Sequence, residues 1–126
     1  MLRLDLLASG ATKDVYALVV GSRCETRDFL DSLPVGVLDK VRAVFQRLGD
    51  LGCAGYKQNV VRHLQGRVFE IKEQTTNRRL FGFMWGQRMV VCTHADRKPA
   101  GKSGYGREID RVNRLMEMCE QEGVLT

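Results

Sequence analysis

Hydrophobic residues recur at three- and four-residue steps in the segment that follows Pro34. This spacing places them along one side of a helix, and the positions are Leu38, Val41, Val44, Phe45, Leu48 and Leu51. We therefore predict a helix over residues 34–51, with Pro34 in its first turn and Gly52 at its end. A shorter helix is predicted to precede it, with Thr26 as its N-cap residue.

The hydrophobic period changes after Gly55. Four runs of strand type follow, separated by short turns, over residues 60–64, 67–73, 79–85 and 88–94. Because these connections are too short for crossovers, the strands must form antiparallel hairpins. An earlier strand is predicted over 15–20, and a last helix from Gly106 to Gln121. The order of elements predicts an α+β fold, in which a central antiparallel β-sheet is flanked by two N-terminal helices and a C-terminal helix.

The chain reads as one domain over residues 1–126, because no repeat, linker or low-complexity tract divides it. Its 44% hydrophobic and 28% charged residues suit a folded protein with a buried core. Residues 1–13 lack a clear period and are expected to form at most a loosely ordered N-terminal extension. Arg3 and Asp5 interrupt the apolar start before a signal-peptide core forms, and no apolar run is long enough to cross a membrane. We expect a cytoplasmic protein.

The cysteines lie far apart in the sequence, at Cys24, Cys53, Cys92 and Cys119. No pair has C-x-x-C spacing, and none lies near a histidine at the spacing of zinc ligands. We therefore predict reduced and buried thiols, without a disulfide framework, a metal site or a cofactor.

Positive charge is concentrated in residues 56–102. The whole chain has a net charge of +5, whereas this segment carries +7, because only Glu70, Glu73 and Asp96 oppose its basic residues. Those basic residues are Lys57, Arg62, Arg67, Lys72, Arg78, Arg79, Arg88, Arg97, Lys98 and Lys102. Such a concentration favours a polyanionic partner. A solvated basic face without any partner would give the same pattern.

Polar residues of the strand over 67–73 suit chemistry on a phosphodiester. Glu70 and Lys72 share one face of this strand, and Arg79 lies across the hairpin. A carboxylate can accept a proton, and cations can stabilise the charge of a phosphorane. On residue types alone, a row of cross-strand ion pairs on a solvated sheet face is the commoner explanation.

Four segments add a similarity to a known family. Leu64–Lys72, which reads LQGRVFEIK, contains the glutamate strand, and in Asn77–Gln87 an arginine opens an aromatic run. Thr93–Gly104 precedes the last predicted helix with Arg97, Lys98 and Lys102, and Phe29–Pro34 joins the first two helices. In this order the segments resemble the RelE/HigB superfamily of toxins, specifically its HigB-type branch with phage-derived relatives. The similarity spans roughly residues 14–120, with motifs that are each only moderately specific.

The resemblance implies a RelE-like toxin of a type II toxin–antitoxin pair, which cleaves mRNA on the ribosome without a metal. In such enzymes the ribose 2′-hydroxyl attacks the adjacent phosphate. The family positions place catalytic residues at Glu70, Lys72, Arg79 and Lys98. Glu70 or Lys98 would take or relay the proton, while Lys72 and Arg79 would stabilise charge.

The same resemblance implies residues and partners for binding. RNA would bind to Lys57, Arg62, Arg67, Arg97 and Lys102. These cations are expected to form one positive surface together with Arg79 and Lys98. The partners would be a cognate antitoxin of the small helix-turn-helix type, mRNA and the ribosome, and no membrane.

The chain departs from the family at several positions, among them Gly104 in place of the terminal proline. Asp96 stands where an aromatic residue is expected, and Pro99 stands in place of the second lysine, although Arg97 compensates in charge. Two alternatives therefore stay open. One is a catalytically silent binding protein of phage or prophage origin on the same fold, and the other is a ParE-like inhibitor of DNA gyrase.

Some residues keep more than one interpretation. His63 and His94 fit either acid–base catalysis or packing, and Tyr105 fits either stacking on a base or capping of the last helix. A regular strand would put Arg79 on the same face as the aromatic residues that follow it, whereas a bulge at Gly82 would change that face. The side of the sheet on which Arg79 lies is open.

Overall fold

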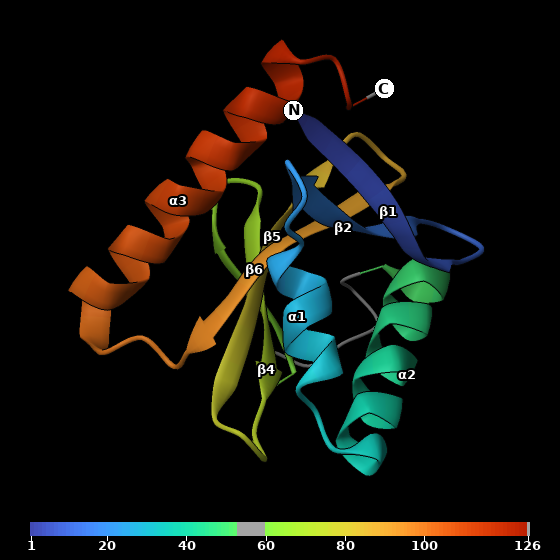
Figure 1. The fold of residues 1–126 in the computed structure, drawn as a ribbon, viewed down its shortest axis with the longest axis vertical. Coiled ribbons are helices and arrows are strands. Elements are labelled where there is room, and N and C mark those ends of the chain that lie inside the picture. The colour runs from blue at the N-terminus through green and yellow to red at the C-terminus, as the bar shows by residue number, and fades with distance from the viewer. Residues whose placement is uncertain (53–59, 126) are drawn as a thin grey trace.

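A computed structural model describes residues 1–52 and 60–125 of the chain. Within them the elements follow the order β1 (Leu2–Ser9), β2 (Asp14–Val20), α1 (Glu25–Asp31), α2 (Val35–Leu51), β3 (Val61–Gln65), β4 (Val68–Glu73), β5 (Arg78–Trp85), β6 (Met89–Arg97) and α3 (Gly101–Gln121). The strands form one sheet in the order β1-β2-β6-β5-β4-β3. Helices α1 and α2 lie on one face of this sheet and α3 on the other (Figure 1). The predicted α+β class, with helices flanking the sheet, is confirmed.

Strands β3 to β6 are antiparallel neighbours, as the short turns predict. The sheet as a whole is mixed, because β2 pairs in parallel with β6 and β1 pairs with the other edge of β2. A parallel pair needs a long connection, which the elements between β2 and β6 supply. Val15, Ala17 and Leu18 of β2 are all buried, which is typical of an interior strand covered on both faces.

Residues 2–9 form the edge strand β1 and not the loosely ordered extension that the sequence predicts. The side chains of Leu2 and Leu4 join the core under α3. The strand pairs with β2 from Leu2 opposite Val20 to Ser9 opposite Asp14. Hydrogen bonding to β2 and burial of these leucines on one face stabilise the order of this segment.

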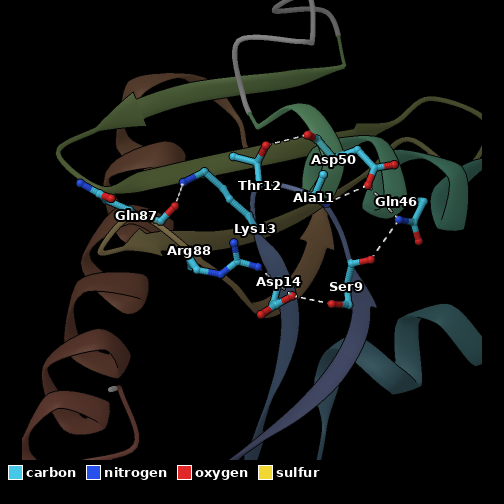
Figure 2. Close-up of polar contacts among 9 residues, drawn as sticks. All are labelled: Ser9, Ala11, Thr12, Lys13, Asp14, Gln46, Asp50, Gln87 and Arg88. Carbon is cyan, nitrogen blue, oxygen red and sulfur yellow. Dashed lines mark hydrogen bonds and ion pairs between the residues drawn. The ribbon is translucent and has the colours of Figure 1, made fainter.

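The loop between β1 and β2 is held against the C-terminal end of α2. The N–H groups of Thr12 and Lys13 both donate to the carbonyl of Gly49, at 2.9 and 2.7 Å, and the Thr12 hydroxyl donates to the carbonyl of Asp50 at 2.7 Å (Figure 2). These bonds satisfy carbonyl groups that the last turn of a helix leaves unpaired. The approach requires glycine at position 10, since a Cβ there would lie 2.0 Å from the carbonyl carbon of Gly49.

The helix boundaries differ from the predictions at two N-termini. Helix α1 is capped by Cys24, whose Sγ accepts a hydrogen bond from the N–H of Arg27 at 3.4 Å. Thr26 is buried and donates its hydroxyl proton to the carbonyl of Cys92 at 3.2 Å, so its role is to join α1 to the sheet. Helix α3 begins at Gly101 and not at Gly106. No helix within the described residues is long and apolar enough to span a bilayer.

Candidate functional site

An inner row of residues crosses the sheet on the face under α3. The strand register sets Arg62 of β3 opposite Glu70 of β4, Glu70 opposite Phe81 of β5, and Phe81 opposite His94 of β6. Directly opposed residues in a sheet lie on the same face, about 4.5–5.5 Å apart. The inner row therefore brings Glu70, a predicted catalytic residue, beside Arg62, a predicted RNA-binding residue.

An outer row lies next to it, toward the turn between β4 and β5. It consists of Lys72 of β4, Arg79 of β5 and Asp96 of β6, which the register places opposite one another. Lys98 is nearby in the chain, and its N–H donates to the carbonyl of Asn77 in that turn at 3.1 Å. Three of the four predicted catalytic residues thus lie at one end of the sheet.

Regular alternation along β5, and not a bulge at Gly82, sets the face of Arg79. Phe81 pairs with His94, but Gly82 pairs with Cys92, so the extra residue is in β6 and not in β5. Strand β5 stays regular, and Arg79 keeps the face of Phe81, whose ring is completely buried. Phe81 therefore packs in the core under α3 and is not an exposed platform for stacking RNA bases.

Glu70 is the centre of the buried charges. Its side chain has no exposed surface, and its Oε1 lies 3.3 Å from Nη2 of Arg62 and 3.9 Å from Nε of Arg79. Arg79 is also buried, with 6% of its surface exposed, whereas the side chain of Arg62 is 36% exposed. The carboxylate therefore orients two guanidinium groups beneath α3.

The hydrogen bonding of this cluster is incomplete. Within the described part of the chain, the Nε atoms of Arg62 and Arg79 and the Oε2 atom of Glu70 are buried without a hydrogen-bond partner. Leaving buried polar atoms unpaired costs about 1–3 kcal/mol each, and more where they are charged. The cluster therefore carries a cost in stability at the place where the predicted catalytic residues meet.

Tyr105 of α3 closes the cluster from above. Its hydroxyl donates to Oε1 of Glu70 at 3.3 Å, and the guanidinium of Arg62 lies 5.0 Å from the centre of its ring. The ring also packs edge-on against Phe81, with centroids 6.5 Å apart. Burial and the contact with Glu70 raise the pKa of the Tyr105 hydroxyl. Capping of the last helix is not its role, because Tyr105 lies inside α3, whose N-cap residue is Ala100, and the guanidinium of Arg62 occupies one face of its ring.

His94 forms a second polar contact between the sheet and α3. Its Nε2 lies 3.2 Å from Oε1 of Glu108, and its Nδ1 lies 2.8 Å from the hydroxyl of Thr93, which donates to the carbonyl of Phe81 at 3.2 Å. The hydroxyl has a single proton, so when it donates to Phe81, Nδ1 donates to Thr93 and Nε2 of the neutral ring accepts. Glu108 then donates to Nε2 of His94 when its carboxyl group is protonated, which completes the series of hydrogen bonds.

The acidities of these groups agree with that arrangement. Burial is the main cause that lowers the pKa of His94 to about 4. Burial, together with the nearby carboxylate of Asp96, raises the pKa of Glu108 to about 7. His94 therefore carries a neutral imidazole, and the carboxyl group of Glu108 keeps its proton up to about neutral pH.

The predicted RNA-binding cations do not all lie together. Arg97, Lys98 and Lys102 are exposed around the end of β6 and the start of α3. Arg67 precedes β4, at the end of the strand opposite to the β4–β5 turn and about 20 Å from that turn along the strand. Its guanidinium stacks 4.6 Å over the ring of Trp85. The expected single positive surface therefore does not extend from Lys98 to Arg67, and Lys57 lies outside the described residues.

A cleft of about 1000 Å³ opens beside the exposed group of cations, between the end of β6 and the outer side of α3. Its walls include Glu108 and the exposed side chain of Lys98. The basic residues lining it are Arg97, Lys98, Arg107, Arg111 and Arg114, and the acidic ones are Asp96, Glu108, Asp110 and Glu117. The buried pair of His94 and Glu108 thus reaches this cleft through Glu108.

The contribution of Glu108 escaped prediction from the sequence. It follows Tyr105 by three residues and precedes Val112 by four, so it lies in the stripe of α3 that faces the sheet. An acidic residue on the apolar face of a helix indicates, from the sequence alone, that its side chain makes a buried polar contact. Among residues 1–52 and 60–125, no group of three or more His, Cys, Asp or Glu side chains is arranged to hold a metal ion.

Comparison with known proteins identifies the family. No curated protein and no solved structure matches the chain. The model of the family described as phage derived protein Gp49-like (DUF891) matches residues 28–117, from α1 into α3. That family is part of the RelE/HigB-like toxin superfamily, and its members are commonly toxins of toxin–antitoxin pairs. Because the match covers more than half of the sequence, the chain belongs to the phage-derived Gp49-like family of RelE/HigB-like toxins.

Proposed function

We propose that the chain is the toxin of a type II toxin–antitoxin pair and cleaves mRNA on the ribosome by metal-free attack of a 2′-hydroxyl. The observation that carries this proposal is the cationic end of the sheet, where Lys72 lies opposite Arg79 beside the buried Glu70 and Lys98 follows the end of β6. Membership of the Gp49-like family supports it. The partners that follow are an antitoxin of helix-turn-helix type, mRNA and the ribosome, and the compartment is the cytoplasm.

The reaction needs three contributions from the protein. A base removes the proton of the 2′-hydroxyl, cations stabilise the pentavalent phosphorus, and an acid protonates the 5′-oxygen when the P–O5′ bond breaks. The products are a 2′,3′-cyclic phosphate and a free 5′-hydroxyl. Lys98 is the exposed member of the candidate set, so we assign to its ammonium group the binding of the reacting phosphate and the protonation of the leaving oxygen.

Glu70 has a different part in the observed conformation. It has no exposed surface and is engaged by Arg62 and Arg79, so it positions these arginines and does not itself meet solvent. Direct contact of RNA with Glu70 or Arg79 requires the first turns of α3 to move off the sheet. The unpaired Nε atoms of Arg62 and Arg79 are then available to the phosphate, and Oε2 of Glu70 is available to accept from a hydroxyl group.

The burial also favours one alternative, a catalytically silent binding protein on the same fold. Asp96 lies opposite Arg79 in the outer row, where its negative charge opposes the binding of a phosphate. As a silent binding protein, the chain would bind RNA or protein through the cations at the end of β6 and would not cleave the phosphodiester bond.

Induced expression in a bacterium, followed by mapping of mRNA 5′ ends, tests the proposal. Lys98→Ala should reduce cleavage about a hundred- to a thousandfold, because it removes one preorganised charge-stabilising group. Lys40→Ala is the matched control, since Lys40 is an equally exposed lysine on α2, away from the site. Arg79→Ala should also abolish cleavage, with circular dichroism to verify folding.

The outcomes separate the candidates. Equal cleavage by the wild type and Lys98→Ala would show that the family positions do not act in this chain. Growth arrest without new mRNA ends, but with DNA damage, would indicate gyrase inhibition. Neither cleavage nor growth arrest by the folded wild type would favour the silent binding protein.

A further inference from the structure

Strand β1 is an edge strand whose outward groups are open between Leu2 and the bulge at Leu7. The carbonyl of Met1 accepts a hydrogen bond from Gly21 after β2, at 2.8 Å, whereas the N–H of Leu2 points the other way, to Oε1 of Glu122 at 3.0 Å. Backbone groups alternate along a strand, so those of Leu4 and Leu6 also point outward. Within residues 1–52 and 60–125 they pair with no other strand (Figure 1).

The side chains of this stretch alternate in a way that suits pairing with itself. The sequence from Leu2 to Leu6 reads LRLDL, with a leucine at each outward backbone position and opposite charges at Arg3 and Asp5. The leucines face the α3 side, and Leu6 is 54% exposed at the end of that row. Arg3 and Asp5 lie on the other face, with side chains 66% and 34% exposed.

We propose that two copies of this chain associate by antiparallel pairing of their β1 strands, with the two-fold axis at Leu4. Hydrogen bonds then form between the Leu4 residues of the two copies and between Leu2 of one copy and Leu6 of the other. The exposed Leu6 side chain is covered by Leu2 of the second copy. The proposal does not rest on the nuclease function.

The charges of Arg3 and Asp5 favour this register over the others that the backbone allows. Only the outward-facing Leu2, Leu4 and Leu6 can exchange hydrogen bonds, so the allowed registers differ from one another by two residues. Centring the pair on Leu4 sets Arg3 opposite Asp5 of the second copy in a narrow, non-hydrogen-bonded pair, where side chains approach most closely. Moving the axis toward the N-terminus sets Arg3 opposite Arg3, and moving it toward the C-terminus sets Asp5 opposite Asp5.

Neighbouring features confine the contact to this stretch. The bulge at Leu7 ends the regular edge, and Gln46 of α2 occupies the carbonyl of Ser9 with a hydrogen bond of 3.1 Å. At the other end, the bond from Leu2 to Glu122 is exchanged for one to Leu6 of the second copy. Glu122 is exposed, so its carboxylate is solvated by water after the exchange.

Sedimentation velocity of the full chain over a concentration series tests this pairing. The wild type should form a dimer, and either single reversal, Arg3→Asp or Asp5→Arg, should weaken it about tenfold or more, because like charges then face each other at two places. The double variant Arg3→Asp/Asp5→Arg restores opposite charges, keeps the net charge and should dimerise again. Circular dichroism verifies that the single variants, which also lose the Arg3–Asp5 contact of 3.2 Å within one chain, remain folded.

A backbone variant tests the pairing independently of charge. Leu6→Pro removes an outward N–H without removing a bond of the β1–β2 ladder, and proline is tolerated at such edge positions. It should dissociate the dimer while the monomer stays folded. A wild type that is monomeric at all concentrations would overturn the proposal and leave this edge to a strand of another protein. Equal association of all the charge variants would also overturn it.

Discussion

Polar side chains are concentrated in two regions, which differ in burial and in how completely they are hydrogen-bonded. The loop network joins the β1–β2 loop to α2 and to the β5–β6 turn, and comprises Ser9, Ala11, Thr12, Lys13, Asp14, Gln46, Asp50, Gln87 and Arg88 (Figure 2). Its hydrogen bonds range from 2.7 Å, between Lys13 Nζ and the carbonyl of Gln87, to 3.3 Å, between Gln46 and Asp50. Under α3, by contrast, Glu70 and Arg79 are buried with unpaired atoms.

The difference bears on what each region contributes to the stability of the fold. Exposed polar groups lose little when a contact fails, because water replaces the partner. A buried ion pair is often no more stable than well-packed apolar residues of the same size, so its presence is poor evidence of a contribution to stability. The loop network is explained by docking of the β1–β2 hairpin, and the rows under α3 are the region to which we assign the proposed binding or catalysis.

The largest effect is expected from Glu70→Ala. Removing this carboxylate leaves the guanidinium of Arg79 buried without a counter-ion and that of Arg62 partly so. Breaking a buried ion pair from one side typically costs about 3–5 kcal/mol. We expect a loss of this size in the free energy of unfolding, measured by urea denaturation.

A double variant distinguishes charge from packing at this place. In Glu70→Leu/Arg79→Met the buried charge and its partner leave together, so most of the lost stability should return. A loss below about 1 kcal/mol in Glu70→Ala would remove the contrast between the two regions.

The next effect lies in the hairpin loop. In Gly10→Ala the new Cβ would meet the backbone of Gly49 at 2.0 Å, so the loop must move away from α2. We expect a loss of about 1–3 kcal/mol in the free energy of unfolding, as for other overpacked sites. Gly36→Ala is the matched control, because a Cβ at this exposed position of α2 meets nothing within 4 Å and alanine favours the helix. Equal stability of both variants would show that the loop is not held closely.

The elements that the sequence predicts well are those with a long or clean period. Helix α2 and the strands β3 to β6 have enough hydrophobic positions, or turns short enough, to fix their type. Strand β1 was missed because its alternation of Leu2, Arg3, Leu4 and Asp5 is short and resembles an irregular mixture of apolar and charged residues. Its pairing with β2, and the parallel pairing of β2 with β6, depend on contacts distant in sequence.

The sequence predicts that the candidate residues lie close together, but not that two of them are buried. The resemblance places Glu70, Lys72, Arg79 and Lys98 together, and the structure shows the first three in adjacent rows on one face and Lys98 at their end. Their catalytic roles remain predictions. That α3 covers Glu70 and Arg79 could not be inferred, since the helix begins earlier than its period suggests and its side of the sheet is set by tertiary packing.

The free energy of unfolding should depend on pH through two residues under α3, His94 and Glu108. The folded-state pKa of His94, about 4, lies below its usual value of 6.5, so this group alone makes the protein lose stability as pH falls from 6.5 to 4. The pKa of Glu108, raised from 4.5 to about 7, acts in the opposite sense, because its contribution is fully present below 4.5 and is lost as pH rises through 7. Between 4.5 and 6.5 the two effects oppose each other.

The variant Glu108→Gln should therefore reveal the effect of His94. Burial, the main cause of the low pKa of His94, remains in this variant. We expect it to lose about 1–3 kcal/mol more than the wild type between pH 7 and pH 4, measured by urea denaturation at each pH. The double variant His94→Gln/Glu108→Gln should follow the wild-type profile, and a Glu108→Gln profile parallel to the wild type would contradict the assignment.

The smallest effect is expected from Asp50→Ala in the loop network. The Asp50 carboxylate accepts hydrogen bonds from the N–H of Ala11 at 3.0 Å and from Nε2 of Gln46 at 3.3 Å, and both contacts are exposed. Water can replace the carboxylate at each donor, and the carbonyls of Gly49 and Asp50 keep their bonds to the loop. We expect a loss of only about 0.5–1.5 kcal/mol in the free energy of unfolding, with mRNA cleavage unchanged. Asp50→Asn keeps an acceptor and should lose less still. A loss as large as that of Glu70→Ala would show that the hairpin loop, and not the cluster under α3, is the region on which the fold most depends.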